Sequence, residues 1–114
     1  MDDPAVEPIR VSELRGDEGG AWRVVTRDSR HYFDLELGTV TRVRGAGAPP
    51  TINDRTRPLR SIDTLRVGAR GRWTMYTDGW DEDVDFFWAQ TSLVAAIEAI
   101  SRDELPGAGG VVPD

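Results

Sequence analysis

The sequence predicts an α+β protein: an antiparallel meander sheet, or a small open barrel, of about five or six strands with one C-terminal helix. Short runs of β-branched and aromatic residues, separated by turn residues, recur along residues 22–89. Residues 91–105 then carry leucine and isoleucine at helical spacing, with Thr91 or Ser92 as an N-cap and a Pro-Gly pair as the stop.

The 114 residues suffice for one domain. Residues 1–20 are rich in acids, Pro and Gly, so we expect a flexible acidic N-terminal arm, with a short edge strand through Ile9, Val11 and Leu14 as the alternative. Residues 21–105 are expected to form the single α+β domain, and residues 106–114 a flexible tail.

The first strand is expected at residues 22–26, whose sequence WRVVT is typical of a strand. The next strand, residues 31–37 (HYFDLEL), alternates apolar and polar side chains. Residues 39–44 return as its hairpin partner.

Two registers of this hairpin are open. A two-residue turn at residues 38–39 places Leu35 opposite Arg42, an apolar residue against a charge. A shift by one residue pairs Leu35 with Val43 and sets acids opposite arginines on the outer face. We favour the shifted register, because opposite charges across strands contribute about 0.2–1 kcal/mol per pair.

Residues 45–59 form the longest irregular segment, because Pro and Gly recur there. Strands are expected at residues 61–67 and 72–77, with a turn between them. Residues 84–89 (VDFFWA) are expected to form the last strand before the helix, since Val, Phe and Trp favour strands.

The aromatic residues of this region divide between the two faces of the sheet. Trp73, Phe86 and Trp88 are expected in the core. Tyr76 and Phe87 fall on the other face, where either the helix covers them or they form an apolar partner surface. We favour cover by the helix.

The composition excludes several classes of protein. The chain has no cysteine, which rules out disulfides, thiolate metal sites and cysteine nucleophiles. It has no apolar run of membrane-spanning length and no start typical of a signal peptide, so we expect a cytoplasmic protein. The net charge of −6 disfavours general nucleic-acid binding.

Charge is segregated along the chain. Residues 42–72 are rich in Arg, whereas residues 78–85 are rich in acids. We expect mainly internal pairing between the two, with an interaction surface as the alternative. The candidate partner-binding residues are Arg55, Arg57, Arg60, Tyr76 and Phe87. The candidate acidic surface consists of Asp78, Asp81, Glu82, Asp83 and Asp85.

The acidic run begins like a calcium-binding loop, with Asp81, Asp83 and Asp85 at alternating positions. The match fails, because Phe86 stands where the loop needs Gly and Ser92 where it needs Glu. We therefore predict no metal site and no cofactor, and interpret the run as a charged cap on an aromatic hairpin.

His31 is the only histidine of the chain. Asp28 and Ser29 lie close to it in the sequence and suggest a catalytic triad, but a triad needs a geometry that such closeness does not supply. We interpret His31 as a residue at the end of a strand and predict no catalytic residue.

Three stretches, WRVVTRDSRHYFDLELGTVTR, LRSIDTLRVGARG and TSLVAAIEAI, resemble small actinobacterial and actinophage proteins. That group has no established activity. The resemblance implies an origin and a β-rich fold, and it assigns no site residue.

The sequence leaves three hypotheses about function. The first is a non-catalytic cytoplasmic binding protein of the inhibitor or immunity type, whose partner is another protein or a second copy of itself. The second is a phage- or host-encoded regulator that binds nucleic acid through the Arg-rich residues 42–72. The third is a protein that binds a divalent metal through carboxylates.

Overall fold

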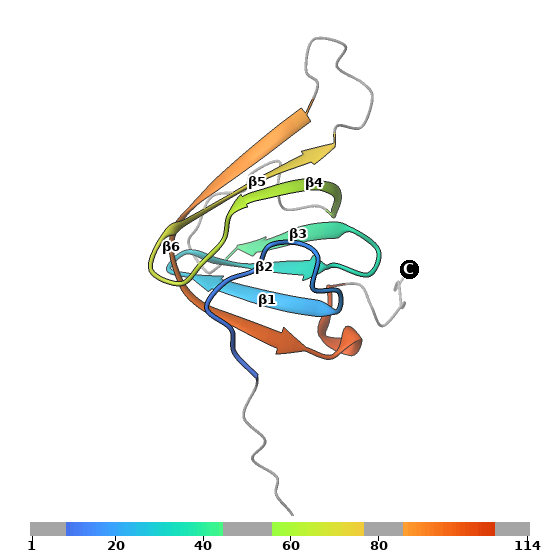
Figure 1. Ribbon diagram of the computed structural model, residues 1–114, viewed down its shortest axis with the longest axis horizontal. Helices are drawn as coiled ribbons and strands as arrows, with labels where there is room; N and C mark the ends of the chain where they lie inside the picture. The colour runs from blue at the N-terminus through green and yellow to red at the C-terminus, as the bar shows by residue number, and fades with distance from the viewer. Residues whose placement is uncertain (1–8, 45–55, 77–85, 107–114) are drawn as a thin grey trace, which may run out of the picture.

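The computed structural model describes residues 9–44, 56–76 and 86–106. Within these residues the chain forms an antiparallel meander that closes into a barrel, in the order β1-β2-β3-β4-β5-β6 (Figure 1). The strands are β1 (Ala21–Thr26), β2 (Ser29–Asp34), β3 (Thr39–Arg44), β4 (Arg57–Thr64), β5 (Arg70–Tyr76) and β6 (Phe86–Ile100). The predicted antiparallel meander is therefore confirmed.

The predicted C-terminal helix is wrong. β6 continues through Ile100, and the only helical turn in the described part of this region is a short 3-10 turn, η2 (Arg102–Glu104). The physical reason is that β6 pairs with β5 over residues 86–93 and with β1 over residues 94–100, so its backbone groups find partners in neighbouring strands rather than within a helix. Tertiary pairing thereby overrides the helical preference of the alanine-rich sequence.

β6 closes the barrel by bending. Residues 86–93 pair with β5, and residues 94–100 pair with β1. Both ladders have an irregular register close to the change of partner, and Figure 1 shows the strand sweeping from the β4–β5 side of the barrel to the β1 side. A bend with irregular pairing is how one strand can serve two differently oriented sheets.

The β2–β3 hairpin adopts neither of the two registers considered from the sequence. Asp34 pairs with Thr39, so residues 35–38 make the turn. The Asp34 carboxylate accepts hydrogen bonds from the backbone N–H groups of Glu36 and Leu37, each at 3.0 Å. Gly38 then adopts a φ of 75°, which glycine tolerates best. The local carboxylate turn therefore decides the register, rather than the cross-strand charge pairs.

Among the described strand pairings of the barrel, the one between β3 and β4 has the fewest paired residues. It consists of the pairs Thr39–Pro58 and Val40–Arg57. β4 thus begins inside the segment predicted to be irregular, whereas residues 45–55 lie outside the described part of the chain.

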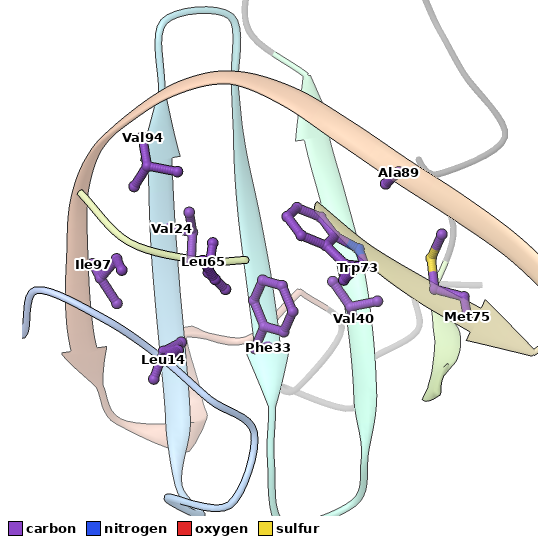
Figure 2. Close-up of a cluster of buried hydrophobic side chains, with 10 residues drawn as sticks. All are labelled: Leu14, Val24, Phe33, Val40, Leu65, Trp73, Met75, Ala89, Val94 and Ile97. Carbon is purple, nitrogen blue, oxygen red and sulfur yellow. The ribbon is translucent and has the colours of Figure 1, made fainter. Parts of the chain in front are cut away.

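The core lies inside the barrel, where Figure 2 shows side chains from β1, β2, β3, β5 and β6 converging with Leu14 and Leu65. Phe33 and Trp73 meet edge to face, with ring centroids 4.9 Å apart. The prediction that Trp73 is buried is confirmed. The prediction for Trp88 is wrong, since 54% of this residue is exposed, and Phe86 is only half-buried. On this part of β6 the inward positions belong to Phe87 and Ala89 instead, opposite Met75 and Trp73.

The N-terminal segment contributes to this core. Leu14 is 1% exposed, and its backbone N–H donates a hydrogen bond to the Leu65 carbonyl. The Val11 N–H donates to the Ile97 carbonyl at 3.0 Å, so the segment lies along β6 before it reaches Leu65. Part of the region expected to be a flexible arm, from residue 9 onward, is therefore packed on the barrel, while residues 1–8 are outside the described structure.

Candidate partner-binding face

The outer side of β5 and β6 carries large aromatic side chains. Tyr76 pairs with Phe86 and Thr74 pairs with Trp88 in one antiparallel ladder. Paired residues point to the same side of a sheet, and alternate residues share that side. Because Trp73 and its pair partner Ala89 point into the barrel, these ring-bearing residues point out of it.

Two arginines complete this surface. The Arg60 guanidinium carbon lies 4.2 Å from the centroid of the Phe86 ring, and that of Arg72 lies 5.0 Å from the Trp88 ring. Arg60 belongs to β4 and Phe86 to β6, so the Arg60 side chain spans β5. We call the surface formed by Arg60, Arg72, Tyr76, Phe86 and Trp88 the Arg–aromatic face.

The Arg–aromatic face is accessible. Tyr76 is 52% exposed and Trp88 54% exposed, and both arginines are exposed. Thr74, which pairs with Trp88, is buried, and its hydroxyl shares a 2.6 Å hydrogen bond with the hydroxyl of Ser61 in β4. The face is thus a layer of rings and guanidinium groups on a closed, hydrogen-bonded sheet.

Within residues 9–44, 56–76 and 86–106, one carboxylate, that of Asp63, forms an ion pair with an arginine of this face. Among the residues that the structure describes, Arg60 and its neighbour Arg70 form no ion pair. Arg72 approaches the Asp63 carboxylate only at 4.0 Å, and both side chains are about half exposed. Such an exposed pair contributes little to stability.

Two other arginines, Arg10 and Arg23, are paired with one carboxylate. Glu98, a buried residue of β6, accepts hydrogen bonds from Arg23 at 2.8 Å and from Arg10 at 3.2 Å. The bond from Arg23 lowers the pKa of Glu98 below its ordinary value, against the opposing effect of burial. This cluster fastens the N-terminal segment and β1 to the end of β6.

A second closed pair lies at the C-terminal end of the domain. Arg102 donates to both oxygens of Asp34, at 2.6 and 3.0 Å. This bond from Arg102 lowers the pKa of the Asp34 carboxyl, and the turn N–H groups of Glu36 and Leu37 act in the same direction. Asp34 thereby holds the β2–β3 turn and the η2 turn together, a structural role.

The structure separates the residues predicted to bind a partner. Arg60 and Tyr76 lie on the Arg–aromatic face. Arg57 is buried over the Phe87 ring, at 4.6 Å, and Phe87 packs against the core. Arg55 and the acidic surface of Asp78, Asp81, Glu82, Asp83 and Asp85 lie outside the described residues.

Arg72, Phe86 and Trp88 were not among the predicted partner-binding residues. Alternation along residues 70–76 and 86–90 could have found them, because Arg72 and Tyr76 share one side of their strand. The expectation of a helix over the sheet hides this signal, because it places Trp88 in the core.

His31 is buried and meets Trp73 edge to face, with ring centroids 4.9 Å apart. Its Nε2 lies 3.0 Å from the Ser29 hydroxyl, beside a pocket of about 160 Å³ near the β6 bend. Asp28 pairs instead with Arg27, at 3.3 Å, on the surface. The arrangement secures the β1–β2 turn through Ser29 and does not assemble the triad considered from the sequence.

In the parts of the chain that the structure describes, no three His, Asp or Glu side chains gather as a metal site would require. The same residues include no helix of the length and apolarity needed to cross a membrane. Comparison with protein-family models, with curated protein sequences and with solved structures finds no match.

Proposed function

We propose that this protein is a small non-catalytic binding module that holds another protein on its Arg–aromatic face. The observation that carries the proposal is the pair of half-exposed rings, Tyr76 and Trp88, set beside arginines on a rigid sheet. Trp, Tyr and Arg are the residues that most often dominate protein–protein binding energy. Large exposed rings held in one place also lose little conformational entropy when a partner covers them.

The packing beneath the face supports this proposal. The sheet pairs β5 with β4 on one side and with β6 on the other, so its backbone is fixed before any partner arrives. The guanidinium group of Arg72 lies over the Trp88 ring, which restricts both side chains. A surface ordered in advance keeps the entropic penalty of binding low.

The test is a comparison of retained proteins between variants. Immobilised wild-type protein and the variants Trp88→Ala and Arg72→Gln are exposed to an extract of the cells that produce the protein. We expect a defined protein to be retained by the wild type and lost with both variants. The control is Arg30→Gln, which removes an exposed arginine of β2 away from the face and leaves retention unchanged.

Two results would contradict the proposal. One is retention that does not differ between the wild type and the two face variants. The other is a retained species that nuclease removes and protease does not.

Single-stranded nucleic acid is the second candidate partner, and the same exposed rings beside arginines favour it. The substitutions suited to this test are Arg60→Gln and Arg72→Gln, because Arg57 is buried inside the barrel. Binding to an oligothymidylate should then fall steeply with salt and should weaken in both variants. The net charge of −6 opposes this candidate, which therefore ranks second.

A further inference from the structure

We infer that a pocket at the bend of β6 binds a small neutral polyhydroxylated ring, such as a pyranose sugar. None of the described residues that line this pocket belongs to the Arg–aromatic face, so the inference goes beyond the proposed function. The pocket lies between the β1–β2 turn and the stretch of β6 that changes partner from β5 to β1. Its described wall includes Thr26 and Ser29 from one side and Gln90, Thr91 and Ser92 from the other.

The size and the polarity of the pocket define the kind of occupant. Its volume is about 160 Å³, and a cavity of about 150 Å³ holds one six-membered carbon ring. Of the nine described residues that line the pocket, only Ala89 has an apolar side chain. An apolar ring would therefore remove polar groups from water without giving them hydrogen bonds in return. The occupant is a ring of this size that carries its own hydrogen-bonding groups.

Four buried polar side chains form the floor of the pocket. Thr26, Ser29, His31 and Thr91 are each at most 8% exposed. The Nε2 atom of His31 lies 3.0 Å from the Ser29 hydroxyl, which in turn lies 3.3 Å from the hydroxyl of Thr26. Thr91 is held from the other side, because its hydroxyl accepts the Gly71 N–H at 2.9 Å. The floor is thus ordered before any ligand enters, which lowers the entropic penalty of binding.

The hydrogen bonds within this floor determine what a ligand has to offer, because a hydroxyl group donates once and accepts twice. The Thr91 hydroxyl donates to the Ser92 carbonyl at 2.6 Å, and the Thr26 hydroxyl donates to the Ser29 carbonyl at 3.1 Å. The proton of the Ser29 hydroxyl is used in its bond to His31 or to Thr26. The floor can therefore accept further hydrogen bonds but has no hydroxyl proton left to donate. Ligand O–H groups meet this need, whereas a phosphate or carboxylate oxygen does not.

The β6 side of the pocket both donates and accepts. Gln90 is exposed, and its side-chain amide offers two N–H donors and a carbonyl oxygen. The hydroxyl of Ser92 is buried and has no hydrogen-bond partner in the part of the chain that the structure describes. A buried hydroxyl without a partner is unfavourable, so a ligand hydroxyl that supplies this partner gains affinity. Sugar hydroxyls donate and accept at one oxygen and therefore match both the floor and β6.

The experiment titrates the full chain with defined small molecules. The probes are the methyl α-pyranosides of glucose, galactose and mannose together with myo-inositol, and the comparison compounds are benzene and inorganic phosphate. NMR follows the side-chain amide of Gln90 and the backbone N–H groups of Gly71 and Thr91. We expect at least one probe to move these signals saturably, with a Kd in the millimolar range, and to bind at least about fivefold more tightly than benzene or phosphate.

Variants assign the binding to the pocket. Gln90→Ala removes an exposed side chain, so the chain should stay folded while the probe binds at least about threefold more weakly. Thr91→Val keeps the shape of the side chain and removes an acceptor of the floor, so we expect a loss of at least about fivefold. If the missing bond from Gly71 unfolds this variant, Gln90→Ala decides alone. The control is Ser12→Ala, at an exposed hydroxyl of the N-terminal segment, which should leave binding unchanged.

Each other outcome overturns the inference. If phosphate moves the signals and no polyol does, the pocket is an anion site and the assignment of its protons is wrong. If benzene binds as tightly as the best polyol, the polar wall does not select the ligand. If no compound gives a saturable change at tens of millimolar, or if Gln90→Ala binds the probe as tightly as the wild type, the pocket is not a polyol site. None of these results involves a protein partner, so the retention experiment still decides the proposed function by itself.

Discussion

Gly71 lies in the wall of the barrel where there is no room for a side chain. A Cβ atom added there would stand 2.9 Å from the Trp73 ring, 3.1 Å from the Thr91 hydroxyl and 3.2 Å from a Leu65 methyl group. The Gly71 N–H also donates to the Thr91 hydroxyl at 2.9 Å. Glycine at this position therefore allows β5, β6 and the core to approach closely.

Replacing Gly71 by Ala should destabilise the protein by about 1–3 kcal/mol, because the core would have to move away from the added methyl group. The measurement is urea unfolding of the wild type and the variant. The exposed neighbour Arg70, replaced by Ala, should change stability by less than about 0.5 kcal/mol. Equal stability of Gly71→Ala and the wild type would show that the wall is less tightly packed than described.

The paired carboxyls make stability depend on pH in a defined direction. Hydrogen bonds from arginines lower the pKa values of Asp34 and Glu98 in the folded state. Groups with a lowered folded pKa bind fewer protons when folded than when unfolded, so their contribution is complete above the ordinary carboxyl pKa of about 4–4.5. This contribution to stability is lost as the pH falls below about 4 and through the lowered pKa values of the folded state.

We therefore expect the free energy of unfolding to fall between about pH 4.5 and the acid limit, and Glu98→Gln should make this fall shallower. At pH 7 the same substitution should cost about 1–3 kcal/mol, because it weakens the charge-assisted hydrogen bonds from two arginines at a buried site. Urea unfolding at several pH values measures both effects. Asp103→Asn, at an exposed acid without an ion pair among the described residues, is the control at pH 7, where it should change the free energy of unfolding by less than about 0.5 kcal/mol.

At the scale of elements, β6 is the strand on which the barrel depends. It is 15 residues long and pairs with β5 in its first half and with β1 in its second. Ala96 lies in the second half, half-buried, opposite Val25 of β1. Substitution of Ala96 tests directly whether this segment is a strand or a helix, because β-branched residues stabilise strands and destabilise helices.

Replacing Ala96 by Val should leave stability unchanged or raise it by up to about 1 kcal/mol, through a β-branched pair with Val25. In a helix the same change would lower stability by about 0.5 kcal/mol. Thermal unfolding followed by circular dichroism measures the difference. A clear loss of stability would count against the strand assignment at this position.

The N-terminal segment is a second element with a defined energetic role. Leu14 fills the core, whereas Ile9 is 71% exposed. Leu14→Ala should therefore destabilise the protein by about 2–5 kcal/mol, because a cavity would replace a fully buried side chain. Ile9→Ala is the matched control, with an expected loss under about 0.5 kcal/mol in the same urea experiment. A small effect at Leu14 would mean that the barrel is stable without this segment.

At the scale of the whole molecule, the closed barrel separates stability from binding. The hydrophobic core lies inside the barrel, and the carboxylates paired with arginines lie on β2 and at the end of β6. The Arg–aromatic face lies on the outer surface of β4, β5 and the start of β6. Substitutions on the face should therefore change binding without unfolding the chain. This separation is what makes the binding experiments interpretable.

The combined variant Arg72→Gln and Trp88→Ala should stay folded, with a loss of no more than about 1–2 kcal/mol. Exposed cation–π contacts contribute about 0.5–1 kcal/mol, and a half-exposed ring buries only part of its surface. Two-dimensional NMR spectra and urea unfolding check this expectation. Loss of the dispersed spectrum would show that the face also holds the barrel together.

Much of the fold is readable from the sequence, and the candidate site less so. Strands at residues 22–26 and 72–76 follow from their β-branched and aromatic residues, and Trp73 is recognisable as core. The side of the sheet on which Trp88 lies is not readable from the sequence, because it depends on whether the following residues continue as a strand. An assumed helix would have covered the face that the structure leaves open.

The sequence by itself determines a single antiparallel meander without cysteine chemistry, because side-chain alternation and turn residues are local properties. Only the tertiary structure decides that residues 91–100 are strand, that Leu14 joins the core and that Trp88 faces outward. The strand at residues 94–100 depends on long-range pairing with β1, between residues 68 to 79 positions apart. The backbone hydrogen bonds gained by closing the barrel outweigh local helix preference, and no window of the sequence contains both partners.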